Sequence, residues 1–256
     1  MNHIQLKTKE DIEILKEGGR IHGHILRALG EAVKPGVSAM EIDTLARALF
    51  EEAGVTPAFL NYTPEGVSYP YPAAVCVSVN DEVVHGIPHE DIIFQEGDIV
   101  SVDIGVKHKG MITDAAITVP CGEVSDEARK IISITKEALH VGIKAAVVGN
   151  TVGDIGYAIE QFVKPYGYGI VKILAGHGVG YSVHEEPYVP NYGKKGDGPK
   201  LVPGMVLAIE PMLTLGTDEV AVTEDEYTYV TYDGSLATHF EHTIAITEEG
   251  TIVLTK

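Results

Sequence analysis

Four carboxylates of this chain stand inside apolar, β-branched segments that are typical of buried strands. They are Asp103, Asp114, Glu210 and Glu241. Burying a carboxylate costs free energy unless it is paired with a positive charge or binds a cation. Basic partners are scarce, because Lys107 and Lys109 lie in a predicted turn and no arginine is near these segments. The four carboxylates therefore indicate a cation site.

Any one of these carboxylates could instead lie on the solvated face of a sheet, which is the more common case. All four together, with the glycine-flanked His177, favour the cation site. Oxygen-rich ligation with one imidazole suits Mn²⁺, Fe²⁺, Co²⁺ or Zn²⁺. Five ligands are too many for a single zinc, whereas two bridging carboxylates serve a metal pair. A pair about 3.5–4 Å apart can activate a shared water, so hydrolysis is the predicted chemistry.

Other catalytic motifs do not fit. The segment His184-Glu185-Glu186-Pro187-Tyr188 has Tyr188 where a helical zinc motif has its second histidine, and Pro187 opposes a helix. The sequence has no nucleophile elbow and no phosphate-binding P-loop. The glycines of residues 176–180 are in the wrong phase for a dinucleotide fingerprint. Cys76 lies in an apolar strand, which favours a packed thiol over a nucleophile.

Composition narrows the function further. The 256 residues carry a net charge of −18, with 19 basic against 37 acidic side chains, which argues against a DNA-binding groove. The two cysteines are too few for a disulfide framework in a chain of this size. Residues 1–7 are polar and show no signal core, and no apolar run reaches the roughly 20 residues that span a bilayer. We expect a cytoplasmic protein with no membrane partner.

Periodicity predicts the elements that position the ligands. Helices are expected over residues 8–33, 38–54 and 125–148, and from Thr151 until Pro165 and Gly167 end the last one. Ser38 and Glu41 form a capping box. Strands are expected at residues 74–79, 98–106, 111–119, 169–174, 204–210 and 238–247, with a hairpin turn at residues 107–110.

The order of these elements repeats. Residues 36–38 with Ile42 and Gly54 match residues 149–151 with Ile155 and Gly167 at a constant offset of 113. Two strands led by glycine each deliver a carboxylate six residues later, namely Asp103 and Glu210. We predict a single α+β domain, residues 1–256, with two similar αα-β halves over about 8–120 and 125–250. Asp103 and Glu210 would then face each other across a pseudo-dyad.

The chain closely resembles the type I methionine aminopeptidases, which have the pita-bread fold of two pseudo-symmetric αα-β halves around a central antiparallel sheet. The matching segments run in order over nearly the whole chain: residues 80–88, 98–103, 113–114, 176–180, 184–187, 203–212 and 240–243. The resemblance implies a dinuclear centre. Asp114 and Glu241 would bridge the two metals, Asp103 would bind one of them, and His177 with Glu210 the other.

The same resemblance implies roles for three catalytic residues. His85 would lie by the substrate's amine and scissile amide, His184 would donate to the scissile carbonyl, and Glu210 would be the general base. Tyr71 and Cys76 match positions of the methionine pocket, and Phe59 is a further candidate. The chain has no tryptophan, whereas bacterial relatives often place one at the pocket rim; Tyr227 takes that place here.

The predicted function is removal of the initiator Met from nascent proteins and peptides with a small second residue, by metal-activated hydroxide. Proline-specific peptidases share the fold and ligands, but the surroundings of His85 and Glu241 resemble the methionine enzymes. Only 33 residues separate His177 from Glu210, too few for the helical insertion of type II enzymes, and no room is expected for an N-terminal zinc finger. The alternatives are an Xaa-Pro aminopeptidase and a non-catalytic binding protein. A monomer with transient ribosome contact is expected.

Overall fold

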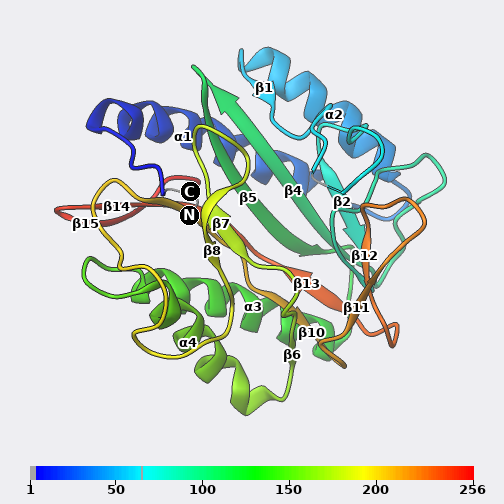
Figure 1. Ribbon diagram of the computed structural model, residues 1–256. Helices are drawn as coiled ribbons and strands as arrows, with labels where there is room; N and C mark the ends of the chain where they lie inside the picture. The colour runs from blue at the N-terminus through cyan, green and yellow to red at the C-terminus, as the bar shows by residue number, and fades with distance from the viewer. Residues whose placement is uncertain (1–3, 65) are drawn as a thin grey trace.

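The computed structural model describes residues 4–64 and 66–256. Two helix pairs, α1 with α2 and α3 with α4, flank a central group of strands (Figure 1). The polar N-terminal segment predicted above lies partly outside the described residues, because residues 1–3 are not included. Among the helices that the structure describes, none is both long and apolar enough to cross a membrane.

The four helices begin where the sequence predicts. They are α1 (Lys9–Ala32), α2 (Ala39–Glu52), α3 (Asp126–Ala145) and α4 (Val152–Val163), the last followed by the 3₁₀ turn η1 (Lys164–Tyr166). Ser38 and Glu41 form the predicted capping box, and Thr151 with Asp154 form its counterpart at α4. Each box satisfies two backbone N–H groups that the first helical turn leaves unpaired. The predicted αα pairs are confirmed.

The longest strands form a hairpin, β4 (Ile99–His108) with β5 (Met111–Pro120), joined by the predicted turn. Its two central residues, Lys109 and Gly110, have φ of 48° and 86°, as a two-residue turn that matches the strand twist requires. β2 (Cys76–Val79) and β1 (Thr56–Pro57) pair with β4 on its other edge, all antiparallel. Helix α1 packs on both strands of the hairpin.

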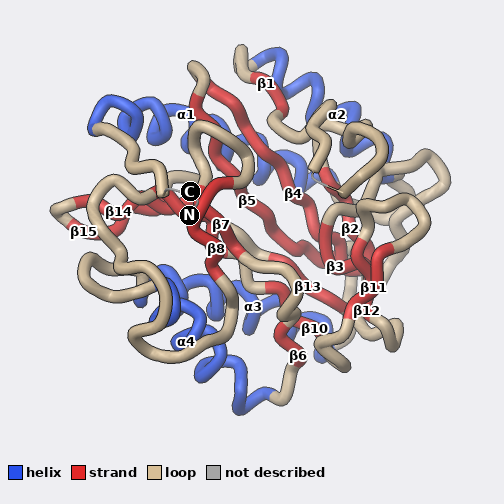
Figure 2. The backbone as a smooth tube through the Cα atoms, viewed as in Figure 1, coloured by secondary structure: helices blue, strands red, loops and turns tan. Residues whose placement is uncertain are grey.

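The second large sheet has the order β15-β14-β9-β7-β8. Its strands are β7 (Gly176–Gly178), β8 (Glu185–Val189), β9 (Val206–Ile209), β14 (His242–Thr247) and β15 (Gly250–Val253). Two three-stranded sheets complete the fold (Figure 2). They contain β13 (Ala237–His239), β10 (Met212–Thr214) and β6 (Gly169–Ile170), and β11 (Val220–Val222), β12 (Tyr229–Thr231) and β3 (Glu82–Val84).

Two strand predictions need correction. The strand expected over residues 238–247 is broken after His239 and resumes at His242. At the break the Glu241 N–H donates to the Ala116 carbonyl at 2.9 Å, so the chain pairs with the β4–β5 hairpin where it passes from the sheet of β13 to the sheet of β14. The strand expected over residues 169–174 is only Gly169–Ile170, because the rest finds no ladder partner in the described residues beyond a bond from Val171 to Met212.

Each helix pair has an apolar core of its own. One cluster joins α1 and α2 to β4 through residues such as Leu29, Ile42 and Val102, and the other joins α3 and α4 to β9 and β14. Gly19 and Gly23 lie one turn apart on α1, where an added Cβ would lie 2.2 Å from the carbonyl oxygens of Leu254 and Lys256. Glycine there lets the C-terminal segment pack directly on the helix.

Candidate metal centre

The β4–β5 hairpin places Asp103 and Asp114 on one face. In the antiparallel register Asp103 is opposite Ala116 and Asp114 is opposite Gly105. Because side chains alternate between faces, positions two apart share a face, and the two carboxylates are diagonal neighbours. Both are buried. Thr243 of β14 fixes the Asp114 backbone: its hydroxyl accepts from the Asp114 N–H at 2.8 Å and donates to the Asp114 carbonyl at 2.7 Å.

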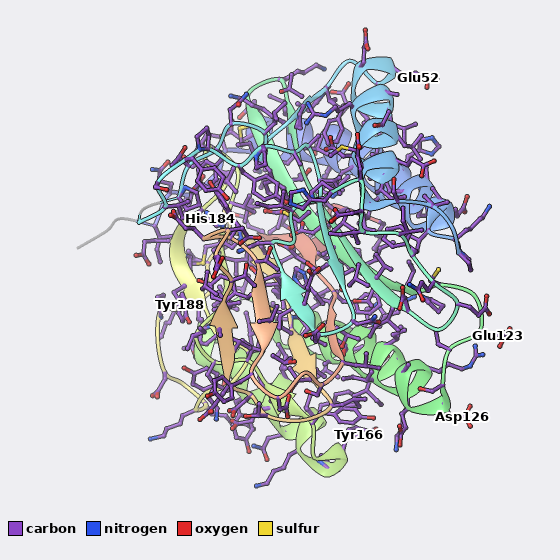
Figure 3. All side chains as sticks on the ribbon, turned by 90° about the vertical axis from the view of Figure 1, so that its right-hand side faces the viewer. Glu52, Glu123, Asp126, Tyr166, His184 and Tyr188 are labelled. Carbon is purple, nitrogen blue, oxygen red and sulfur yellow. The ribbon has the colours of Figure 1, made fainter. Side chains whose placement is uncertain are left out.

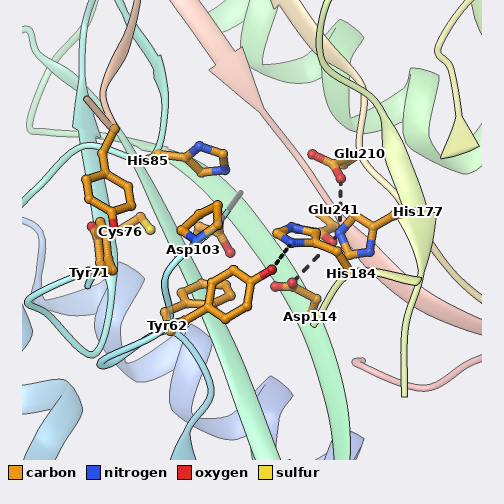
Figure 4. A pocket seen from close by; sticks show the side chains of 13 residues that line it. Tyr62, Tyr71, Cys76, His85, Asp103, Asp114, His177, His184, Glu210 and Glu241 are labelled. Atoms are coloured by element: carbon orange, nitrogen blue, oxygen red, sulfur yellow. Dashed lines mark hydrogen bonds and ion pairs between the residues drawn. The ribbon is translucent and has the colours of Figure 1, made fainter. Parts of the chain in front are cut away.

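The second sheet contributes the other three candidate ligands. His177 on β7 is opposite Ala208 of β9, and Glu210 lies two residues further on, which directs both to the same side. Glu241 immediately precedes β14 and is 2% exposed. Ligand atoms of Asp114, His177 and Glu241 all lie within 4.8 Å of one another. His177 Nε2 is 3.5 Å from Glu210 Oε1 and 4.0 Å from Asp114 Oδ2 (Figure 4).

A backbone carbonyl orients the His177 ring. Its Nδ1 lies 2.8 Å from the Gly178 carbonyl, which can only accept, so the proton is on Nδ1. The lone pair is then on Nε2, the atom that faces the carboxylates. Burial lowers the pKa of His177 to about 3, which keeps the ring neutral. This is the tautomer and the charge state of a metal-ligating imidazole.

The carboxylates lie close together in a largely buried site and repel one another electrostatically. Burial, with a contribution from Glu210, raises the pKa of Asp103 to about 7, and burial raises that of Glu210 to about 8. The pKa values of Asp114 and Glu241 are raised well above their ordinary values by burial and the neighbouring carboxylates. Within the described part of the chain, Asp103 Oδ1, Asp114 Oδ1 and Glu241 Oε1 are buried without a hydrogen-bond partner.

These observations test whether the residues fit a metal. Several buried oxygens lack donors, the imidazole presents a lone pair, and no lysine or arginine in the described structure forms an ion pair with the cluster. Such groups are costly to bury unless a cation is bound. The donor set, oxygen-rich with one nitrogen, fits divalent transition metals.

The cluster opens into an apolar pocket. All of the residues predicted for the metal, catalytic and substrate sites line one cavity, which adds Tyr62 and Pro64 to them. Phe59, Tyr71, Cys76 and Tyr227 form its apolar end and are nearly inaccessible to solvent. The Tyr227 ring meets Tyr71 edge-on, with centroids 5.1 Å apart. Burial raises the pKa of Cys76 well above its ordinary value, so this residue is a packed thiol rather than a thiolate.

Two further histidines, His85 and His184, border the cluster. His85 follows β3 with φ of 62°, and its ring packs edge-on against Tyr229 at 5.9 Å. Burial lowers the pKa of His85 to about 3, so its imidazole is neutral. His184 lies at the rim, with its ring centroid 4.5 Å from that of His177. Figure 3 shows His184 and Tyr188 along one edge of the molecule; His184 lines this cavity, and both residues line a second pocket beside it.

Sequence reasoning missed two residues of this site. His239 is 2% exposed, with Nε2 3.6 Å from Glu210 and 3.9 Å from Glu241. Its spacing of two from Glu241 was an available signal, since such residues share a strand face. Tyr62 has its hydroxyl 2.9 Å from His184 Nδ1, a contact across 122 residues that no local pattern announces.

Comparison with known proteins gives the family of the chain. The model of metallopeptidase family M24 matches residues 13–248. The chain is 46% identical over 257 residues to a methionine aminopeptidase of Aquifex aeolicus, covering 99% of both chains.

Solved structures give the same result for the fold. The crystal structure of methionine aminopeptidase from Thermotoga maritima matches with a TM-score of 0.95 and 42% identity, over 99% of this chain and 100% of that one. A prolidase from Pyrococcus furiosus matches with a TM-score of 0.78 and 27% identity, but the match covers only 65% of the prolidase. The predicted pita-bread fold is confirmed.

Proposed function

Since the chain belongs to metallopeptidase family M24, we propose that it is a methionine aminopeptidase, a metal-dependent hydrolase that removes an N-terminal Met from peptides. The observation that carries this function is a single cavity with a metal-ligand cluster at one end and an uncharged aromatic pocket at the other. The cluster would hold the metal ions that activate water for hydrolysis, and the pocket accepts an unbranched apolar side chain.

Five residues would hold two divalent ions. Asp114 and Glu241 would serve both ions, Asp103 would complete the ligands of one, and His177 with Glu210 those of the other. When bound, such a pair supplies Lewis-acid activation of water and of the scissile carbonyl. Mn²⁺, Fe²⁺, Co²⁺ and Zn²⁺ all suit the donors, and availability decides among them. Because both halves contribute ligands, residues 1–256 act as one domain.

The protein's own side chains orient the substrate and move its protons. Glu210 takes a proton from the attacking water at a carboxylate oxygen, as a general base. His85 is neutral and lies by the substrate amine. His184 donates from Nε2 to the scissile carbonyl oxygen, where negative charge develops. In this tautomer the Tyr62 hydroxyl, 2.9 Å from Nδ1, donates to the unprotonated Nδ1.

The apolar end of the cavity receives the Met side chain. The Tyr71 hydroxyl donates to the Gly86 carbonyl at 2.8 Å and so turns its polar atom away from the pocket. Tyr227 donates to the Tyr69 carbonyl, with the same effect. The aromatic faces and edges that remain suit a flexible thioether, which gains from sulfur–aromatic contacts. Phe59 and Cys76 complete the pocket, and Tyr227 stands where relatives often have tryptophan.

The physiological substrates are nascent polypeptides and peptides that carry an N-terminal Met followed by a small residue. From the family resemblance we infer a monomer that works in the cytoplasm and contacts the ribosome transiently. The net charge of −18 offers little electrostatic attraction to ribosomal RNA, so that contact would be brief.

The decisive experiment is release of free Met from Met-Ala-Ser by chelator-stripped protein, before and after addition of Mn²⁺ or Co²⁺. We expect activity only with metal, and little turnover of Ala-Pro-Ala. Preferred turnover of Ala-Pro-Ala would favour the Xaa-Pro aminopeptidase. No release of Met with any metal, together with no tight binding of divalent ions by calorimetry, would favour the non-catalytic binding protein.

A further inference from the structure

A buried lysine lies outside the catalytic cluster. Lys7 precedes α1, and its side chain is 1% exposed. Lysine is almost never fully buried unless it is paired. Its ammonium donates to the carboxylate of Glu185, itself 5% exposed, and to the Gln5 carbonyl at 3.1 Å. Burial lowers the pKa of Lys7, while Glu185 opposes that shift. The backbone N–H of Lys7 donates to the Gly204 carbonyl at 2.7 Å and so holds the N-terminal arm, the described residues 4–8 that precede α1.

Glu185 shapes the loop between β7 and β8. One of its oxygens accepts from the backbone N–H groups of Tyr181 at 2.6 Å and Ser182 at 2.8 Å, while the other accepts from Lys7. The loop, residues 179–184, ends at His184, the neighbour of Glu185 in sequence. One carboxylate therefore links the N-terminal arm to the backbone that presents His184.

Further contacts press the same loop against the start of α1. The Tyr181 hydroxyl donates to Asp11 at 2.6 Å, and the Lys7 ammonium lies 5.0 Å from the centroid of the Tyr181 ring. Gly180 has φ of 139°, and an added Cβ would lie 2.5 Å from Lys7 Cε. The loop is thus packed closely around the Lys7 side chain.

We propose that Lys7 is a positioning residue for His184: its buried ion pair with Glu185 holds residues 179–184 so that the His184 imidazole lies against the metal-ligand cluster. The inference rests on the proposed function, in which His184 donates to the scissile carbonyl. Without Lys7, the Glu185 carboxylate is buried and unpaired, which is unfavourable. It turns toward water, releases the N–H groups of Tyr181 and Ser182, and lets His184 shift. A misplacement of about 1 Å can cost roughly a hundredfold in rate.

The kinetic test compares Lys7→Met with Lys9→Met, a matched control at an exposed lysine two residues away. With metal-loaded enzyme and Met-Ala-Ser, kcat of Lys7→Met falls by about tenfold to a hundredfold, with KM and bound metal little changed. Lys9→Met has no such effect. In a His184→Ala background, Lys7→Met lowers kcat no further, because it acts through His184. An equal loss in both backgrounds, or loss of bound metal, overturns the proposal.

One more variant and one further measurement keep the test decisive. Lys7→Met with Glu185→Gln removes the unpaired charge while the amide oxygen still accepts from the loop, so it recovers most of the lost kcat; no recovery counts against the ion pair. Amide hydrogen exchange measures the stability of the loop independently of catalytic activity. Lys7→Met speeds exchange of the Tyr181 and Ser182 amides and leaves exchange in β4 unchanged. This readout holds even if the wild type releases no Met, which would refute the proposed function alone. Unchanged loop exchange refutes the positioning role.

Discussion

The two halves of the molecule supply metal ligands in different ways. The first half delivers Asp103 and Asp114 from one hairpin of ten-residue strands, where the strand register sets their separation. The second half delivers His177, Glu210 and Glu241 from strands of three to six residues, and both glutamates lie just outside a strand end. Regular pairing positions the first set, whereas the second depends on links to other elements.

Those links are visible in the structure. The Glu241 N–H donates to Ala116 of the hairpin, and Thr243 bonds the Asp114 backbone twice. The Asn191 side chain donates to the Glu210 carbonyl at 3.0 Å. The same half also presents His184, which touches His177. Changes in the hairpin should therefore act through the metal, while changes in the second half should separate metal binding from substrate chemistry.

The largest effect is expected from Asp114→Asn in the hairpin. An amide is a poor bridge between two metals, so both metal content and turnover should fall. Removing a residue that only hydrogen-bonds to a metal ligand typically lowers metal affinity or activity by about 10–100-fold. Removing a bridging ligand should lower turnover by at least about a hundredfold. Metal analysis and Met-Ala-Ser turnover measure this. Full activity in the variant would remove Asp114 from the site.

His184→Ala should separate the two roles of the second half. Removing a donor to the developing oxyanion typically lowers kcat by about 10²–10³. Metal affinity should stay close to wild type, because His184 is not among the proposed ligands. His177→Ala is the matched comparison and should lose metal. A large loss of metal from His184→Ala would refute its non-ligand role.

Without metal, stability should fall as pH rises above about 6.5. Burial raises the pKa of Asp103 from 3.8 to about 7 and that of Glu210 from 4.5 to about 8, so these two groups bind more protons in the folded state than in the unfolded state. Below about pH 6.5 buried histidines such as His85 and His177, with pKa lowered from 6.5 to about 3, act in the opposite direction, so the free energy of unfolding decreases with pH across roughly pH 6.5–8. Thermal unfolding of chelated protein at several pH values measures it.

The control for this titration is the metal-saturated protein, in which ligation keeps the carboxylates deprotonated and favours the folded state more at higher pH. Metal-free Asp103→Asn should also show a flatter profile than metal-free wild type, because one of the titrating groups is gone. Stability of the chelated wild type that rises from pH 6.5 to pH 8 would contradict the proposed repulsion within the cluster.

Thr243→Val tests the link between the halves. Thr243 is fully buried, and valine keeps its shape but leaves the Asp114 N–H and carbonyl unpaired, at a cost of about 1–3 kcal/mol. Thr247→Val on the same strand is the control, since its hydroxyl bonds only within the β14–β15 hairpin. Urea unfolding compares the two. Equal costs would show that the link adds no special stability.

The same contrast explains how far the sequence could predict this structure. Helix starts and the β4–β5 hairpin carry local signals, such as the capping box at Ser38 and the turn at Gly110, and these predictions are confirmed. Short strands such as β7 span too few residues to show a period. The break at Glu241 depends on pairing with Ala116, and the Tyr62–His184 contact on tertiary folding, so neither has a local signal.

The smallest effect is expected at the N-caps of α2 and α4, where the two halves of the molecule are alike. Ser38 and Thr151 are both buried N-caps of capping boxes. The residues that follow them also match, since Ala39 N–H donates to Ile92 and Val152 N–H to Pro199 at 2.9 and 3.0 Å.

Replacing either N-cap by alanine should lower the free energy of unfolding by about 1 kcal/mol. The loss should be similar in the two halves, and kcat should not change. Thr44→Ala, at an exposed position inside α2, is the control and should be neutral or slightly stabilising, because alanine is the better helix former. Chemical denaturation of the three variants measures this. A much larger cost at one cap would mean that the halves differ in their helices as well as in their ligand strands, whereas equal costs confine the difference to the strands.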